Sequence, residues 1–135
     1  MINLLSICWI FFVSFGCSQK EKNIQVEKNY ALVVNMYSEN NKDYIDADYV
    51  QYFIGEKAIE EAKKRGDSDK RIENGKIVYS VPNDYYIVNE NNKIRKLEVS
   101  NDVKLDYIKK NYKDQLFLLT IQKGKVIEIN EIFIP

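Results

Sequence analysis

The chain has 135 residues, in which 20 basic side chains balance 20 acidic ones, and it contains no histidine. Zero net charge argues against nucleic acid as a partner, because nucleic-acid binding requires a concentrated basic surface. The lack of histidine excludes a Ser-His-Asp triad, a Cys-His dyad, a histidine-ligated zinc site and a histidine general base.

An uncharged, largely apolar segment covers residues 1–16, and the chain becomes polar directly after Cys17. Its apolar run of about fifteen residues is shorter than the roughly 20 that a transmembrane helix requires. The run is typical of a secretory signal, and Ser14 and Gly16 provide the small residues that a signal peptidase needs. We therefore predict a signal peptide over residues 1–16, cleaved before Cys17.

The boundary sequence Ser14-Phe15-Gly16-Cys17 resembles the lipobox of bacterial lipoproteins. The resemblance implies that Cys17 is acylated and anchors the protein to a membrane of the cell envelope, and we expect residues 17–29 to form the lipidated cysteine and a polar tether. By the same resemblance, Ser18 favours the outer membrane over the inner membrane. An ordinary cleaved signal in which Cys17 is incidental, and an uncleaved short anchor, are the alternatives.

Residues 30–135 are of a length suited to a single domain, and their many Tyr, Ile and Val residues favour strands. Acylation of Cys17 and removal of Cys8 with the signal would leave this domain without a free thiol or a disulfide. A dense β-forming run over residues 30–38 and an alternating segment over residues 44–54, separated by a polar turn, predict an antiparallel hairpin.

A short helix is predicted between Gly55 and Gly66. Ala58, Ile59 and Ala62 form a narrow apolar stripe, and acidic residues precede basic ones, which suits the helix dipole. The two glycines can cap the helix at its ends. Residues 67–75 are expected to form a polar loop.

The second half of the chain carries further strand signals. We predict a short strand or turn over residues 76–81, a strand over 85–89 that returns as a hairpin over 94–99, and a strong hairpin of residues 116–122 and 125–134 around a two-residue turn. Residues 103–108 are apolar but ambiguous. The fold class is therefore mainly β (α+β). We expect a small antiparallel barrel of about five or six strands, OB-like (oligonucleotide/oligosaccharide-binding-like), with the helix plugging one end. A flat antiparallel sheet with the helix on one face is the alternative.

Residues 82–91, with the sequence PNDYYIVNEN, resemble a motif in small secreted and lipid-anchored bacterial proteins of unassigned function. The resemblance implies a compact extracytoplasmic domain and no particular activity. Within and beside this motif, Tyr85 and Tyr86 could stack on a ligand with Arg95 nearby. The alternative is that the Asn and Asp residues of the motif only form turns. Neighbouring residues on a strand point oppositely, so only one of the two tyrosines can face the core.

Two acidic groups could suggest a cation site, but neither has the spacing of an EF-hand or a Gly-rich loop around an ion, and we expect no metal and no cofactor. The groups are Asp43, Asp46 and Asp48, and then Asp67, Asp69, Glu73 and Asn74.

The sequence thus favours a lipid-anchored, non-enzymatic binding or interaction module with a protein, peptide or glycan partner. One alternative is a carboxylate-based hydrolase, whose acidic pair would need a separation of about 5–9.5 Å. Another is a structural subunit of an envelope assembly, which an exposed apolar patch would favour. The hydrolase pair would come from Asp46, Asp48, Asp84 and Glu90.

Overall fold

The computed structural model describes residues 24–134, so the predicted signal peptide and Cys17 lie outside the described residues. The main sheet has six strands. These are β1 (Val26–Glu39), β2 (Lys42–Ile54), β5 (Tyr85–Val88), β6 (Ile94–Val99), β7 (Leu116–Gln122) and β8 (Lys125–Ile132). A second sheet contains β3 (Asp69–Glu73) and β4 (Lys76–Ser80). The α-helix of the described part is α1 (Glu56–Arg65), and single 3-10 turns occur at Pro82–Asp84 and Ile108–Lys110.

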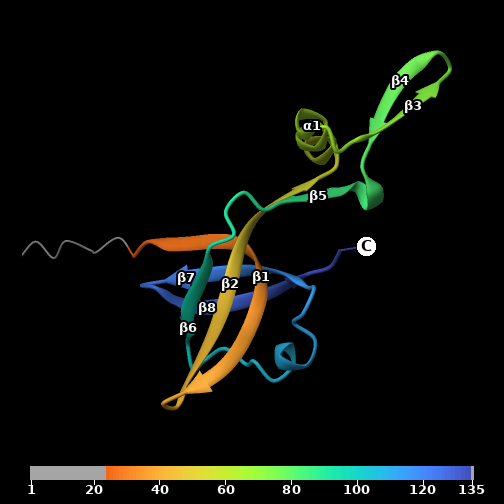
Figure 1. Cartoon of the computed structure of the whole chain (residues 1–135). Helices are drawn as coiled ribbons and strands as arrows, with labels where there is room; N and C mark the ends of the chain where they lie inside the picture. Colours follow the sequence, from red (N-terminus) through yellow and green to blue (C-terminus); the bar gives the residue numbers. More distant parts are fainter. Residues whose placement is uncertain (1–23, 135) are drawn as a thin grey trace, which may run out of the picture.

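The main sheet closes on itself. Strand pairing runs from β1 to β7, β8, β6 and β2, and β2 pairs again with β1. All these pairings are antiparallel except β6–β8, which is parallel over two residue pairs. The sheet is therefore barrel-like, and β1 curves around it (Figure 1). This confirms the predicted mainly β fold with a small, mostly antiparallel, barrel-like sheet and one short helix among the described residues.

The core fills the inside of this sheet. Side chains alternate along each strand, so every second residue of β1, β2, β6 and β7 points inward. Small residues face large ones across the ladder: Ala31 of β1 pairs with Phe117 of β7, and both are buried. The buried core residues are Ala31, Val33, Ile45, Ala47, Val99, Leu105, Phe117, Leu119, Ile121 and Val126.

The helix does not plug the barrel, and this part of the prediction was wrong. Its Ala58 and Ala62 are buried in a separate cluster with Val81, outside the main core. The end of the barrel is covered instead by residues 100–115, which we call the plug segment (Figure 1). Leu105 of this segment is buried in the main core, and Ile108 packs against it. The narrow apolar stripe of the helix packs instead on β2 and β5, and the helix also contacts β4.

One boundary differs from the sequence-based expectation at the start of the domain. Strand β1 begins at Val26, whereas the prediction placed it at residue 30 and assigned residues 26–29 to the tether. Residues 26–29 pair with residues 119–122 of β7. Residues 27–29 are polar, and Val26 is exposed, so the sequence shows no sign of a strand here. The strand forms because β7 supplies the backbone partners without requiring buried side chains at every position.

The predicted loop over residues 67–75 is also different. It contains β3, which pairs with β4 to form a projecting hairpin that we call the arm (Figure 1). Its turn is made by Asn74 and Gly75, both at positive φ, as a tight hairpin turn requires. All five residues of β3 are exposed, so the amphipathic alternation that marks most strands is missing.

The expected hairpin between residues 85–89 and 94–99 does not form. Strands β5 and β6 both pair with β2, which is long enough to hold them one after the other. Strand β5 pairs with residues 51–54 of β2, and β6 pairs with residues 43–48. Residues 89–93 connect the two short strands along the same side of β2.

Candidate binding site on the sheet extension

Strand β2 continues beyond the barrel. Its pairing with β1 ends at the Tyr30–Val50 pair, after which residues 51–54 pair only with β5 among the described strands. Residues 26–29 of β1 turn the other way and pair with β7. We call residues 51–54 together with β5 the sheet extension (Figure 1). It is a two-stranded ribbon that leaves the barrel at the point where β1 and β2 separate.

The helix covers one face of the sheet extension. Phe53 of β2 and Tyr86 of β5 face each other across the ladder and pack against the buried Ala58 and Ala62 of α1. Gly55 begins the helix with a positive φ, and its amide donates to the carbonyl oxygen of Asp84 at 2.8 Å. The sequence therefore folds the chain back directly after β2 and places α1 on the Phe53 side.

The opposite face of the sheet extension carries aromatic and aliphatic side chains. Because side chains alternate, Tyr52 and its cross-strand partner Ile87, and Ile54 and its partner Tyr85, point away from α1. Tyr30 of β1 joins them at the base of the ribbon. Ile54 is 62% exposed, and the others are half-buried. We call this surface the tyrosine face; it consists of Tyr30, Tyr52, Ile54, Tyr85 and Ile87.

Three rings form a row along this face. The ring centroids of Tyr30 and Tyr52 are 5.2 Å apart with an interplanar angle of 59°. Those of Tyr52 and Tyr85 are 6.3 Å apart at 40°. Tilted pairs at such distances stabilise one another, so the row presents a fixed surface with apolar ring faces and polar hydroxyl tips.

The tyrosine face adjoins an open strand edge. In an antiparallel strand, the N–H and C=O of one residue point to the same side, and successive residues point to opposite sides. Since the Gly55 amide points to β5, the backbone groups of Phe53 also point there, and those of Tyr52 and Ile54 point to the other edge. No described strand pairs with β2 at that edge beyond Val50. We call it the open edge.

The three residues singled out in the sequence lie at three different places. Tyr85 belongs to the tyrosine face, whereas Tyr86 points to α1 and its hydroxyl donates to the carboxylate of Asp67. That hydrogen bond, and to a smaller extent the loss of solvation around the phenol, raise the pKa of Tyr86 and keep its proton in place. Arg95 stands on β6 with its guanidinium carbon 4.2 Å from the ring centroid of Tyr49, and its Nη1 donates to the Lys93 carbonyl oxygen at 2.8 Å.

The remaining residues of the tyrosine face were not identified in the sequence as a site. Tyr52 could be assigned to one side of the segment 44–54 by alternation, which also separates it from Phe53. Tyr30 and Tyr52 meet through strand pairing, and Tyr85 joins them because β5 pairs with β2. A single sequence does not reveal these pairings, so the row could not be predicted.

The acidic residues considered for hydrolysis are dispersed or engaged. Asp48 Oδ2 accepts a hydrogen bond from Asn89 Nδ2 at 2.6 Å, and Asp46 Oδ1 lies 3.5 Å from the Tyr37 hydroxyl. Glu90 pairs with Arg65 on the helix. Asp46 and Asp48 share the outer side of β2, but none of the three hollows described in the structure is lined by them, by Asp84 or by Glu90.

Within residues 24–134, no group of three or more acidic side chains gathers in a way that could hold a metal ion. Asp43 of the first acidic group lies 3.5 Å from Lys109 Nζ, and Glu73 of the second pairs with Arg71 at 2.8 Å. The α-helix found in this part of the chain is too short and too polar to span a bilayer.

No protein-family profile, curated protein or solved structure is significantly similar to this chain.

Proposed function

We propose that this protein is a lipid-anchored, non-enzymatic interaction module of the cell envelope that holds an extended segment of a partner protein at the open edge of β2. The observation that supports this proposal is the juxtaposition of unpaired backbone groups at Tyr52 and Ile54 with a row of three tyrosine rings. The anchor is the acylated Cys17, and the outer membrane is favoured over the inner membrane.

The mode of binding is strand addition. A partner segment in extended conformation would form main-chain hydrogen bonds with Tyr52 and Ile54, which supply affinity largely independent of sequence. Every second side chain of that segment would lie over the tyrosine face, where apolar or aromatic residues would gain most. Selectivity would therefore come from alternate positions of the partner.

The anchor would keep this site near the membrane. Strand β1 begins at Val26, so residues 18–25 are the whole connection between Cys17 and the barrel. A fully extended chain covers about 3.3–3.6 Å per residue, so this connection spans at most about 30 Å. The module would then work within one protein diameter of the lipid surface, on partners that are themselves in or close to the membrane.

The open edge is tested by Ile54→Pro. Proline lacks the N–H that a partner strand would use, but the ladder to β5 does not use that group, so the variant should fold. Phage displaying random linear peptides are selected on the full-length protein in lipid nanodiscs. We expect enriched peptides to bind the wild type at least tenfold more tightly than Ile54→Pro, whereas the control Ile54→Val binds as the wild type does. Peptides that bind all three proteins equally, or no enrichment, would refute strand addition.

The anchor is tested separately by metabolic labelling with radioactive palmitate. The wild type should be labelled and should fractionate with membranes, and Cys17→Ser should lose both properties. Equal labelling of the two proteins would show that Cys17 is not the acylation site. Peptide binding at the open edge does not depend on this result.

The alternative role as a structural subunit has one observation in its favour. The arm carries Ile72 and Ile77 opposite each other, and they are 75% and 53% exposed. Such a pair would be buried if the arm inserted into a neighbouring subunit. Arm insertion and strand addition are distinguished by Ile72→Ser, which would disturb an assembly and leave peptide binding at the open edge unchanged.

A further inference from the structure

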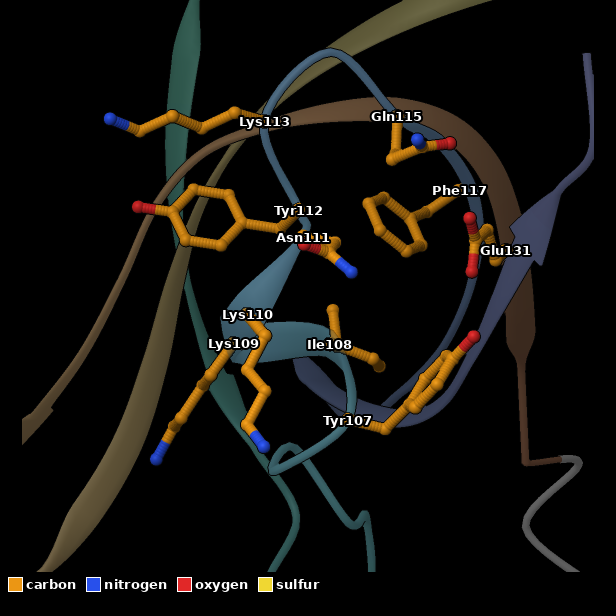
Figure 2. A pocket seen from close by; sticks show the side chains of 10 residues that line it. All are labelled: Tyr107, Ile108, Lys109, Lys110, Asn111, Tyr112, Lys113, Gln115, Phe117 and Glu131. Carbon is orange, nitrogen blue, oxygen red and sulfur yellow. The ribbon is translucent and has the colours of Figure 1, made fainter.

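The plug segment forms one side of a hollow at the end of the barrel. The hollow has a volume of about 650 Å³ and lies between residues 107–113 of the plug segment and the first residues of β7 and the last residues of β8. Pockets for small ligands commonly measure about 300–1,000 Å³. We call this hollow the plug pocket (Figure 2). It lies away from the sheet extension, so its occupant is independent of the peptide proposed above.

The plug pocket has an apolar base and polar walls. Ile108 and Phe117 point into it, and Phe117 is anchored in the core with 1% of its surface exposed (Figure 2). The amides of Asn111 and Gln115 and the carboxylate of Glu131 stand around this base. Each amide is both a donor and an acceptor, whereas the carboxylate is an acceptor.

The lysines of the plug segment do not make the pocket an anion site. Figure 2 shows the side chains of Lys109, Lys110 and Lys113 extending away from the hollow. Lys109 Nζ lies 3.5 Å from Asp43 Oδ1, so it is already partly neutralised. The charge that faces the pocket is that of Glu131, which would repel a phosphate or a carboxylate.

Tyr107 adds an aromatic surface at the mouth. It is 78% exposed, an unusual exposure for a large aromatic side chain, and Figure 2 places it on the same side as Glu131 and Gln115. An exposed ring at this place can cover the apolar face of a ligand that hydrogen-bonds through its rim.

From this geometry we propose that the plug pocket binds a neutral saccharide. Vicinal hydroxyls are each donor and acceptor, and so match the amides of Asn111 and Gln115 and the acceptor oxygens of Glu131. The C–H face of a sugar ring would lie on Tyr107 or on Ile108, because Phe117 below them is almost fully buried. A neutral ligand also avoids repulsion by Glu131, which an acidic ligand would not.

The experiment is calorimetric titration of the full-length protein, in nanodiscs free of sugar-based detergent, with two probes: the trimer of N-acetylglucosamine and the trimer of glucose. We expect saturable binding of at least one trimer. Asn111→Ala, Tyr107→Ala and Glu131→Gln should each weaken it at least tenfold, while Lys110→Ala should change it less than twofold. These four side chains are exposed, so their replacement should leave the fold intact, which circular dichroism checks.

Failure of both trimers to bind would overturn the saccharide assignment. So would binding of inorganic phosphate that is lost in Lys110→Ala, because the pocket would then be an anion site. Ile54→Pro serves as the control for the other site: it should leave saccharide binding unchanged, so that failure at the plug pocket and failure at the open edge are distinguishable.

Discussion

Asp48 lies on the outer side of β2, yet it is only 8% exposed. Its cross-strand partners are Leu32 and Ile94, which are apolar. Oδ2 accepts a hydrogen bond from Asn89 Nδ2 at 2.6 Å, while Oδ1 has no partner within the described residues. The solvation of this carboxylate has therefore been replaced largely by a single amide from the β5–β6 connection.

This dependence predicts the effect of Asn89→Ala. Removing the donor leaves a buried carboxylate unpaired, which should lower the free energy of unfolding by about 1–3 kcal/mol. Urea unfolding of the full chain measures it, with Asn91→Ala, an exposed residue of the same connection, as the control. Adding Asp48→Leu to Asn89→Ala should recover most of the loss, because leucine suits Leu32 and Ile94. If the double variant is as unstable as the single one, the carboxylate is not the cause.

For single residues, the sequence predicted on which side of a strand a side chain lies better than it predicted whether that side chain is buried. Alternation placed Asp46 and Asp48 together on one side of β2, which the structure confirms. Side chains on the outer side of a barrel strand are usually solvated, whereas Asp48 is buried. The difference comes from Asn89, which is far away along the chain and reaches Asp48 only because β5 and β6 both pair with β2.

Among the elements, the arm is the one least tied to the rest of the domain. Both of its strands pair only with each other among the described strands, and the residues of β3 are exposed throughout. On the side nearer the helix, Lys63 Nζ lies 4.3 Å from the centroid of the Tyr79 ring. The hydrophobic core does not include any arm residue.

We therefore expect that replacing residues 70–79 by a short Gly-Ser linker will leave the domain folded. Asp69 and Ser80 are paired at the base of the arm, so the linker joins positions that are already adjacent. The free energy of unfolding should change by less than about 1 kcal/mol, as for other exposed segments. Thermal unfolding followed by circular dichroism is the measurement, and loss of the cooperative transition would contradict the expectation.

The elements that the sequence predicted correctly are those with strong local patterns. The hairpins β1–β2 and β7–β8 and the helix between Gly55 and Gly66 follow from alternation, turns and capping glycines. Residues 67–75 were predicted to form a loop because none of the side chains of β3 is buried. The β5–β6 hairpin was predicted from adjacency in the chain, and the greater length of β2 prevented it.

For the whole molecule, one pairing holds the ring of strands closed. Strands β6 and β8 share only the pairs Glu98–Lys125 and Val99–Val126, supplemented by the hydrogen bond from the Ser100 amide to the Val126 carbonyl oxygen at 2.8 Å. The ion pair of Glu98 with Lys125 at 2.7 Å lies at the same place. The other pairings of the ring extend over at least six residue pairs each.

Amide hydrogen exchange should reveal this asymmetry. We expect the Ser100 amide to exchange at least tenfold faster than that of Leu119, which lies in the middle of β7 between two long ladders. Lys125→Gln should further accelerate exchange of the Ser100 amide and leave the exchange rate of the Leu119 amide unchanged. Equal protection at both positions would mean that the ring opens only with global unfolding. The sequence predicted a barrel, but the identity of its weakest pairing could not be derived from the sequence, because β6 and β8 are not neighbours along the chain.

Strand β1 has a different role in this arrangement, since Tyr30, Ala31 and Leu32 pair with β2 on one side and β7 on the other. If the two-pair seam parts, β1 becomes the spine of an unrolled five-stranded sheet, with its remaining ladders intact. The interior, including Ile45 and Leu119, would then meet solvent in one movement rather than by gradual fraying from the ends. A barrel closed by one short pairing and several long ones can therefore open at a single seam while the rest of its sheet stays paired.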